Sequence, residues 1–132
     1  SEAFEYCSSL TDIKLPQYLD SNWIGSSAFH GCSSLTNITA SEELINEYYD
    51  KFRNTPWFAA QTEKNGFFIL ENRLVGASKT ITKAVIPEGV TSIEERAFYN
   101  CESLKEVIIP GSITSIGGGA FEGCDSLTNI TF

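Results

Sequence analysis

The sequence lacks methionine and contains only one histidine, His30, two tryptophans and four prolines among its 132 residues. It is also poor in cations, since nine lysines and arginines stand against seventeen acidic residues and leave a net charge of −8. A net negative charge is unfavourable for binding to phosphate backbones, which argues against a nucleic-acid-binding protein. The longest apolar runs fall far short of 18 residues, so we predict no insertion of this chain into a membrane.

The sequence begins with Ser1 and not with an initiating methionine. It indicates a processed chain or a piece excised from a longer protein, and we expect any targeting segment to lie outside it. The composition is that of a folded domain. Hydrophobic residues make up 42% of the chain and charged residues 20%, which is enough apolar material to bury a core.

A repeated motif runs through most of the chain. The dipeptide Ala-Phe occurs four times, and each copy is followed at steps of three residues by Cys, Leu and a β-branched residue. The last two copies lie 23 residues apart and the first two 25 apart. The two extra residues fall between Gln17 and Trp23, where a loop can absorb them. The four copies are Phe4, Cys7, Leu10 and Ile13; Phe29, Cys32, Leu35 and Ile38; Phe98, Cys101, Leu104 and Val107; and Phe121, Cys124, Leu127 and Ile130.

Each unit reads Leu-x-x-Ile-x-Ile-Pro, then Val-Thr-Ser-Ile, then Ala-Phe-x-x-Cys. In the copy that begins at Leu104, the alternating apolar residues predict a short strand, which Pro110 ends because proline has no N–H group for further pairing. One unit cannot bury its apolar side alone, whereas stacked units can. The sequence therefore predicts an α/β repeat solenoid, with leucine-rich-repeat-like parallel strands along one face.

The motif resembles the BspA-like leucine-rich repeat, also called the Treponema pallidum type. The segment Ile81 to Cys101 carries it with Ile81 and Ala84 in place of Leu and Val, and with Glu94 in place of glycine. The resemblance covers residues 1–39 and 80–132. It implies a bacterial or protozoan surface or secreted protein that takes part in adhesion and host contact. The copy that matches best is Leu104-x-x-Val107-x-Ile109-Pro110-x-x-Ile113-Thr114-x-Ile116-Gly117-x-x-Ala120-Phe121-x-x-Cys124.

Residues 41–79 interrupt the repeat, because no Ala-Phe-x-x-Cys occurs there. Apolar residues at helical spacing follow Ser41, which predicts a helix with an N-cap serine. Thr55-Pro56 predicts the start of a second helix, with proline at its first position. Phe67–Leu70 and Arg73–Val75 then flank a two-residue turn, which predicts a β-hairpin.

These assignments divide the chain into three segments. Residues 1–40 and 80–132 are the two blocks of leucine-rich repeats, and residues 41–79 are a helix-helix-hairpin insert. We predict that all three belong to one continuous solenoid domain. The insert is open to two interpretations, a structural spacer between the blocks or a module that contacts a ligand.

The four cysteines occupy a single repeat position, so they predict a ladder of buried thiols rather than disulfides. Neighbouring rungs would lie about 4.7–4.9 Å apart, which a disulfide could span, but side chains in a ladder run parallel. The cysteine spacing contains no Cys-x-x-Cys and His30 is the only histidine, so we predict no metal site. His30 and Cys32 both belong to the repeat turn, and Gly117–Gly119 lacks the Lys-Ser/Thr of a phosphate loop. We therefore predict no catalytic residue and no cofactor.

The residues that flank the middle apolar residue of each strand should point outward. We predict that they form a ligand-contacting surface on the concave sheet. The apolar pair Val85 and Ile108 lies 23 residues apart at one repeat position and would give this surface an apolar centre. The ten predicted contact residues are Asp12, Lys14, Asn37, Thr39, Lys83, Val85, Glu106, Ile108, Asn129 and Thr131.

Two functions remain open on this reading. The first is a non-catalytic binding module of a cell-surface or secreted protein, extracellular in location, which engages a protein or another macromolecule in adhesion. The second is a structural spacer or stalk in a longer surface protein. Both ends of the sequence fall inside a repeat, and such ends expose core residues and an open strand edge. We therefore also expect end-to-end self-association, or a gain in stability when flanking repeats are added.

Overall fold

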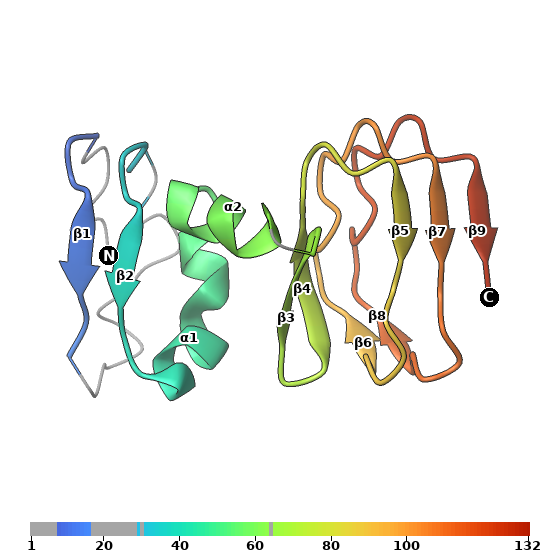
Figure 1. Cartoon of the computed structure of the whole chain (residues 1–132), viewed down its shortest axis with the longest axis horizontal. Coiled ribbons are helices and arrows are strands. Elements are labelled where there is room, and N and C mark those ends of the chain that lie inside the picture. Colours follow the sequence, from blue (N-terminus) through green and yellow to red (C-terminus); the bar gives the residue numbers. More distant parts are fainter. Residues whose placement is uncertain (1–7, 17–28, 30, 64) are drawn as a thin grey trace. The chain divides into compact units, whose positions relative to one another are not determined.

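The computed structural model describes residues 8–16, 29, 31–63 and 65–132 (Figure 1). The predicted repeat positions Phe4 and Cys7, the loop between Gln17 and Trp23, and His30 lie outside the described residues. The chain forms two compact units, residues 1–61 and 62–132.

The first unit contains two short strands, β1 (Asp12–Lys14) and β2 (Asn37–Thr39), which pair in parallel with Ile13 in register with Ile38. Their backbone ladder continues into the next residue, because Leu15 N donates to Thr39 O at 2.8 Å. The core of this unit combines repeat positions with residues of the following helices, namely Leu15, Phe29, Cys32, Leu35, Leu44, Tyr48 and Phe52.

The helices of this unit begin at the capping residues. Helix α1 (Glu42–Tyr48) starts after Ser41, whose hydroxyl accepts a hydrogen bond from the Leu44 N–H at 3.2 Å. This bond satisfies one of the amides that a helix start leaves open. A 3₁₀ turn, η1 (Tyr49–Phe52), follows directly. The apolar residues that follow Ser41 at helical spacing, which the sequence analysis assigned to one helix, are thus divided between an α-helix and a 3₁₀ turn.

Helix α2 (Pro56–Glu63) starts with proline at its first position. Thr55 caps it, since its hydroxyl accepts from the Phe58 N–H at 3.2 Å and donates to Phe52 O at 2.6 Å. Thr55 is buried, and these two bonds satisfy its hydroxyl without water. The cap therefore joins the end of η1 to the start of α2.

The second unit opens with a hairpin of β3 (Phe67–Leu70) and β4 (Arg73–Ala77). The two turn residues Glu71 and Asn72 both have positive φ, 48° and 66°, as a tight two-residue hairpin turn requires. Strand β4 has a second partner, because it pairs in parallel with β6 (Ser92–Ile93). The hairpin strand is therefore also part of the ladder of repeats.

From there each repeat adds one strand to each of two parallel ladders. Strand β8 (Ser115–Ile116) extends the first sheet, whose order is β3-β4-β6-β8. The second sheet consists of β5 (Lys83–Val85), β7 (Glu106–Ile108) and β9 (Asn129–Thr131) in that order. Figure 1 shows β5, β7 and β9 side by side with the same direction. The unit is a repeat fold of short, mostly parallel strands.

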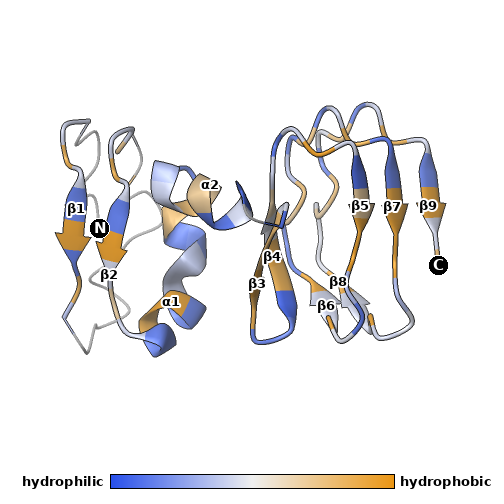
Figure 2. Ribbon diagram, in the orientation of Figure 1, coloured by the Kyte–Doolittle hydropathy of each residue, from blue (hydrophilic) through white to orange (hydrophobic). Residues whose placement is uncertain are grey.

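The core of the second unit lies between the two sheets and consists of repeat positions. Ala84, Val107 and Leu104 lie on or beside the second sheet and are fully buried, and in Figure 2 strands β5, β7 and β9 each begin with a hydrophilic segment that is followed by a hydrophobic one. Phe98 stacks on Phe121 with ring centroids 5.0 Å apart. The remaining core residues are Leu74, Ala77, Ile86, Val90, Ile93, Ala97, Cys101, Ile109 and Ala120.

Candidate functional site

Six of the ten predicted contact residues lie on β5, β7 and β9. On β5 and β7 they flank a buried residue, because Ala84 and Val107 occupy the central positions and are fully buried, whereas the central residue of β9, Ile130, is 43% exposed. Parallel pairing places equivalent positions next to each other across the sheet. The two rows that result are Lys83, Glu106 and Asn129, and Val85, Ile108 and Thr131.

One row is polar and the other is largely apolar. Lys83 Nζ lies 3.8 Å from Glu106 Oε1, a partly exposed ion pair along the first row. In the second row Val85 is 55% exposed and stands next to the half-buried Ile108. Single exposed apolar residues are common on proteins, but two neighbours beside a charged row form a small apolar centre with a polar border.

The other four predicted contact residues lie on β1 and β2 in the first unit. Asn37 Nδ2 donates to Asp12 Oδ1 at 2.7 Å, and Thr11 Oγ1 donates to Asp12 Oδ2 at 2.7 Å. The bonds from Thr11 and then from Asn37 hold the pKa of the Asp12 carboxyl below its usual value, because they favour the charged form. Lys14 and Thr39 lie exposed at the other end of the same strands.

The ten residues are thus divided between the two units, four on β1 and β2 and six on β5, β7 and β9. Within each unit the structure brings them together as the register predicts. A single surface across all five strands stays a prediction.

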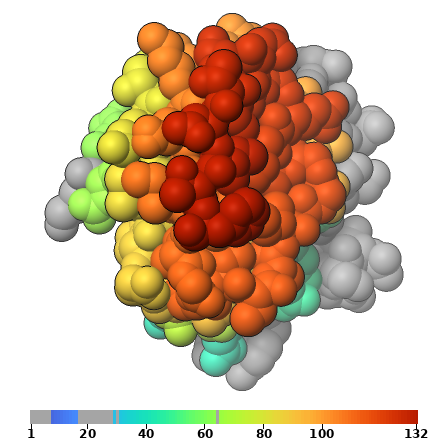
Figure 3. All heavy atoms as spheres, turned by 90° about the vertical axis from the view of Figure 1, so that its right-hand side faces the viewer, coloured from blue at the N-terminus to red at the C-terminus, as the bar shows by residue number. Residues whose placement is uncertain are grey.

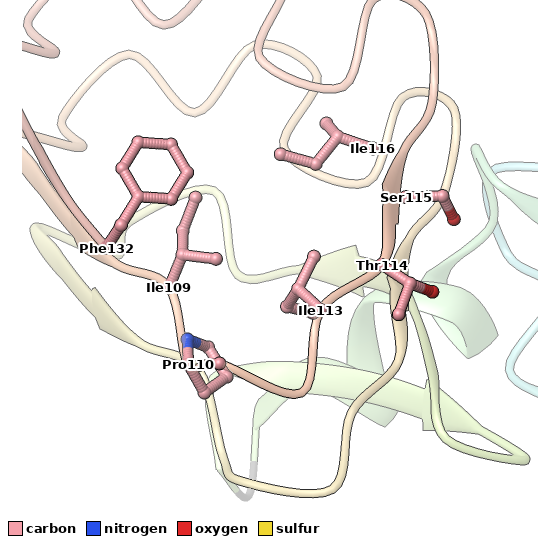
Figure 4. Close-up of a pocket in the computed structure, with 8 residues that line it drawn as sticks. Ile109, Pro110, Ile113, Thr114, Ser115, Ile116 and Phe132 are labelled. Atoms are coloured by element: carbon pink, nitrogen blue, oxygen red, sulfur yellow. The ribbon is translucent and has the colours of Figure 1, made fainter.

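The second unit also has a hollow, which the sequence analysis did not identify. It has a volume of about 280 Å³ and is bordered mainly by apolar side chains. In Figure 4, Phe132 and Ile109 stand on one side of it, with Ile113 and Ile116 opposite. Pro110, Gly111, Thr114 and Ser115 complete the border. Its apolar lining suits another apolar surface better than a charged ligand.

Three residues that border the hollow occupy apolar positions of the repeat motif. Ile109, Ile113 and Ile116 are core positions of the motif, and the equivalent residues of the preceding repeat, Ile86 and Val90 among them, are buried. The repeat pattern alone assigns all copies to the core. It does not say which copy has a neighbour on only one side.

The described cysteines, Cys32, Cys101 and Cys124, are free thiols. Cys124 Sγ donates to Phe98 O at 3.1 Å and Cys101 Sγ to Ser78 O at 3.6 Å, so each thiol bonds a carbonyl some 23 residues or more back along the chain. Burial raises the pKa of the Cys101 thiol to about 11 and also raises that of Cys124. Thiols held in this neutral form are poor nucleophiles.

In the part of the chain that the structure describes, no group of three or more His, Cys, Asp or Glu side chains could hold a metal ion. No described helix is long and apolar enough to cross a membrane. Two surfaces of the described residues are candidates for contact with a partner, the outward rows on β5, β7 and β9 and the apolar hollow.

Comparisons with known proteins agree with the repeat fold. A family model described as a BspA type leucine rich repeat region, with six copies, matches residues 1–74 and 71–132. These matches include the helices and the hairpin that the sequence analysis treated as an insert. A comparison with curated proteins gives no match.

One solved structure is similar along the whole chain. It is that of a leucine rich cell surface protein from Faecalibacterium prausnitzii, with a TM-score of 0.59 and 23% sequence identity. The alignment covers 100% of this chain and 44% of the other. The chain thus spans less than half the length of that protein, and the likeness is one of fold.

Proposed function

Because the chain belongs to the family of BspA type leucine-rich repeat proteins, we propose that it is a non-catalytic, protein-binding module of an adhesive surface or extracellular protein. Its contact surface is the outward face of β5, β7 and β9. The observation that carries this proposal is the apolar pair of the exposed Val85 and the half-buried Ile108, in register beside the ion pair of Lys83 and Glu106.

Several features support a binding face over a plain spacer. A spacer needs only small polar residues on its outward face, whereas Val85 leaves more than half of its surface in water. Interfaces combine an apolar centre, which loses water on contact, with a polar border that aligns the partner. The pair is held on paired strands, so it is already ordered before a partner arrives and less entropy is lost on binding.

The experiment is a binding screen with immobilised extracellular-matrix proteins and cell-surface glycoproteins as probes. Ile108→Glu places a charge in the apolar centre, and we expect it to weaken binding at least about tenfold. The matched control is Ile69→Glu, which places the same charge on an exposed isoleucine of β3, away from this face. Thermal unfolding checks that both variants keep their fold.

A third variant tests the helical segment as the competing contact site. Trp57→Ala removes a half-buried aromatic side chain next to Phe52 and Phe58. Loss of binding in folded Trp57→Ala, together with unchanged binding in Ile108→Glu, would assign the contact to the helices. Absence of binding to every probe would favour the spacer.

A further inference from the structure

The turn between α2 and β3 contains the only Asn-Gly pair of the sequence, Asn65-Gly66. Asn65 is exposed and Gly66 is half-buried. The turn belongs to the second unit and directly precedes β3, the edge of the first sheet that lies opposite to β8. Figure 3 looks onto the other end of the unit, where the last repeat stands in front in red and orange. The surroundings of the pair are therefore set by residues in the middle of the chain.

The backbone at position 66 requires glycine. Gly66 has a φ angle of +80°, a conformation that strains a residue with a Cβ atom. A Cβ atom at this position would also lie 3.3 Å from Ile81 Cδ1, so the isoleucine side chain would have to shift. The Gly66 carbonyl accepts a hydrogen bond from the Ser78 N–H at 2.9 Å, which fixes the start of the hairpin. The fold therefore keeps a glycine directly after the exposed Asn65.

Two groups of this pair are able to react with each other, the side-chain amide of Asn65 and the backbone nitrogen of Gly66. Attack of the nitrogen on Asn65 Cγ closes a five-membered ring, and the chain itself holds the two groups close together, which favours an intramolecular reaction. Glycine has no side chain that would crowd the attacking nitrogen. Among the described residues, none accepts a hydrogen bond from the Gly66 N–H. The nitrogen is thus not held away from the Asn65 side chain by a bond to a neighbouring strand.

We propose that Asn65 is a site of spontaneous covalent modification, at which the folded chain deamidates. The Gly66 nitrogen loses its proton and forms a bond to Asn65 Cγ, and the bond between Cγ and Nδ2 breaks. The leaving nitrogen takes up a proton and departs as ammonia, which leaves a cyclic imide. One water molecule then opens the imide. Cleavage of the bond between the Gly66 nitrogen and Cγ gives aspartate, whereas cleavage of the bond between this nitrogen and the residue 65 carbonyl carbon gives isoaspartate.

Both products change the connection between α2 and β3. Each adds one negative charge to a chain with a net charge of −8, because a carboxylate is ionised at neutral pH. Isoaspartate also leads the main chain through its own Cβ atom, which lengthens the connection by one atom. The exposed residue 65 lies outside the core of the second unit, and the strand pairing begins after it, with Phe67 opposite Ala77. We therefore expect the modified chain to keep its fold.

A second exposed asparagine of the same unit provides an internal comparison. Asn72 also lies in a turn and is also exposed. It precedes Arg73, whose side chain crowds the backbone nitrogen that would have to attack. Asn72 thus shares the exposure and the turn with Asn65 and lacks the following glycine. Deamidation at Asn65 should be at least about tenfold faster than at Asn72, because only the Asn-Gly pair reaches the reactive geometry easily.

Incubation of the intact 132-residue chain at neutral pH tests the site. Ion-exchange chromatography should show a more acidic form that accumulates with time, and peptide mass spectrometry should locate the exchange of amide for carboxylate at residue 65. Isoaspartyl methyltransferase, used as a probe, should methylate the incubated chain and not the fresh one. Asn65→Gln should abolish the acidic form, because the longer side chain would have to close a larger ring. The matched control Asn72→Gln should leave its accumulation unchanged.

A parallel incubation in urea measures the reaction of the unfolded chain, and thermal unfolding of the incubated protein checks its fold. Reaction at Asn65 in the folded chain, within about tenfold of the rate in urea, is the expected result. Two outcomes would overturn the proposal. One is a folded chain that stays unmodified while the chain in urea reacts, which would mean that the turn holds the two groups apart. The other is an acidic form that accumulates equally fast in Asn65→Gln, which would place the modification elsewhere.

Discussion

The inner rung of the second unit, β6 and β7, and its end rung, β8 and β9, carry the same repeat positions in different surroundings: β6 and β8 are both Ser-Ile, and β7 and β9 both have a β-branched residue at the centre. Each strand of the inner rung pairs on both sides, and each strand of the end rung pairs on one. The isoleucine of Ser92–Ile93 is fully buried, whereas that of Ser115–Ile116 is 45% exposed. In a repeat fold, burial is therefore decided by the neighbouring repeat and not by the motif itself.

This difference predicts that equivalent substitutions have unequal effects. Stability in such a fold is approximately a sum of contributions from each repeat and from each contact between neighbours. A residue of the inner rung takes part in two such contacts and a residue of the end rung in one. Pairs of variants at equivalent positions measure this difference directly.

The largest effect should come from Phe98→Ala compared with Phe121→Ala. Phe98 is fully buried between Phe67, at 6.3 Å, and Phe121, at 5.0 Å between ring centroids. Its removal should lower the free energy of unfolding by about 3–5 kcal/mol. Phe121 is half-buried, and its removal should cost roughly half as much. Urea denaturation measures both, and equal losses would contradict the comparison.

A smaller effect is expected for Ile93→Ala compared with Ile116→Ala. Loss of the buried Ile93 side chain leaves a cavity and should cost about 2–4 kcal/mol. The Ile116 side chain is exposed for nearly half of its surface, so its loss should cost about 1 kcal/mol.

Two neighbouring glycines after β8 differ in the same way, since Gly117 lies against the inner rung and Gly118 does not. A Cβ atom on Gly117 would lie 2.4 Å from the backbone nitrogen of Glu95 in the inner rung, whereas one on Gly118 would meet nothing within 4 Å. Gly117→Ala must therefore push two repeats apart and should cost about 1–3 kcal/mol. Gly118→Ala should change the unfolding free energy by about 0.5 kcal/mol or less. Equal thermal stability of the two variants would mean that the close backbone contact carries no energy.

Much of the fold follows from the sequence because the repeat has a constant phase. The positions of Ile13, Ile38, Val107 and Ile130 predict the centres of four strands, and parallel pairing then sets the register. The capping residues predict where the helices begin, since Ser41 satisfies a backbone amide that is otherwise open. These features depend on local chemistry or on the period alone.

Other features depend on contacts that the motif does not encode. Leu74 lies in the repeat ladder in register with Ile93, but no Ala-Phe-x-x-Cys marks its repeat, so the sequence analysis placed it in the insert alone. The hollow is bordered by Ile109, Ile113, Ile116 and Phe132, and no residue of the motif marks it. The outward rows around Val85 were predictable because side chains alternate between the two faces of a strand. The division of the ten contact residues between two units was not predictable from the sequence.

The thiols of the two rungs should make the stability of the fold depend on pH. Burial raises the pKa of Cys101 from 9.0 to about 11, so between these values the folded chain keeps a proton that the unfolded chain loses. The free energy of unfolding should therefore fall as pH rises from about 9 to about 11. Cys101→Ala should make this fall shallower than in the wild type, and Cys124→Ala should reduce it less because Cys124 is only half-buried. Unfolding by urea at a series of pH values measures the slopes, and a slope unchanged by Cys101→Ala would show that the buried thiol does not contribute to it.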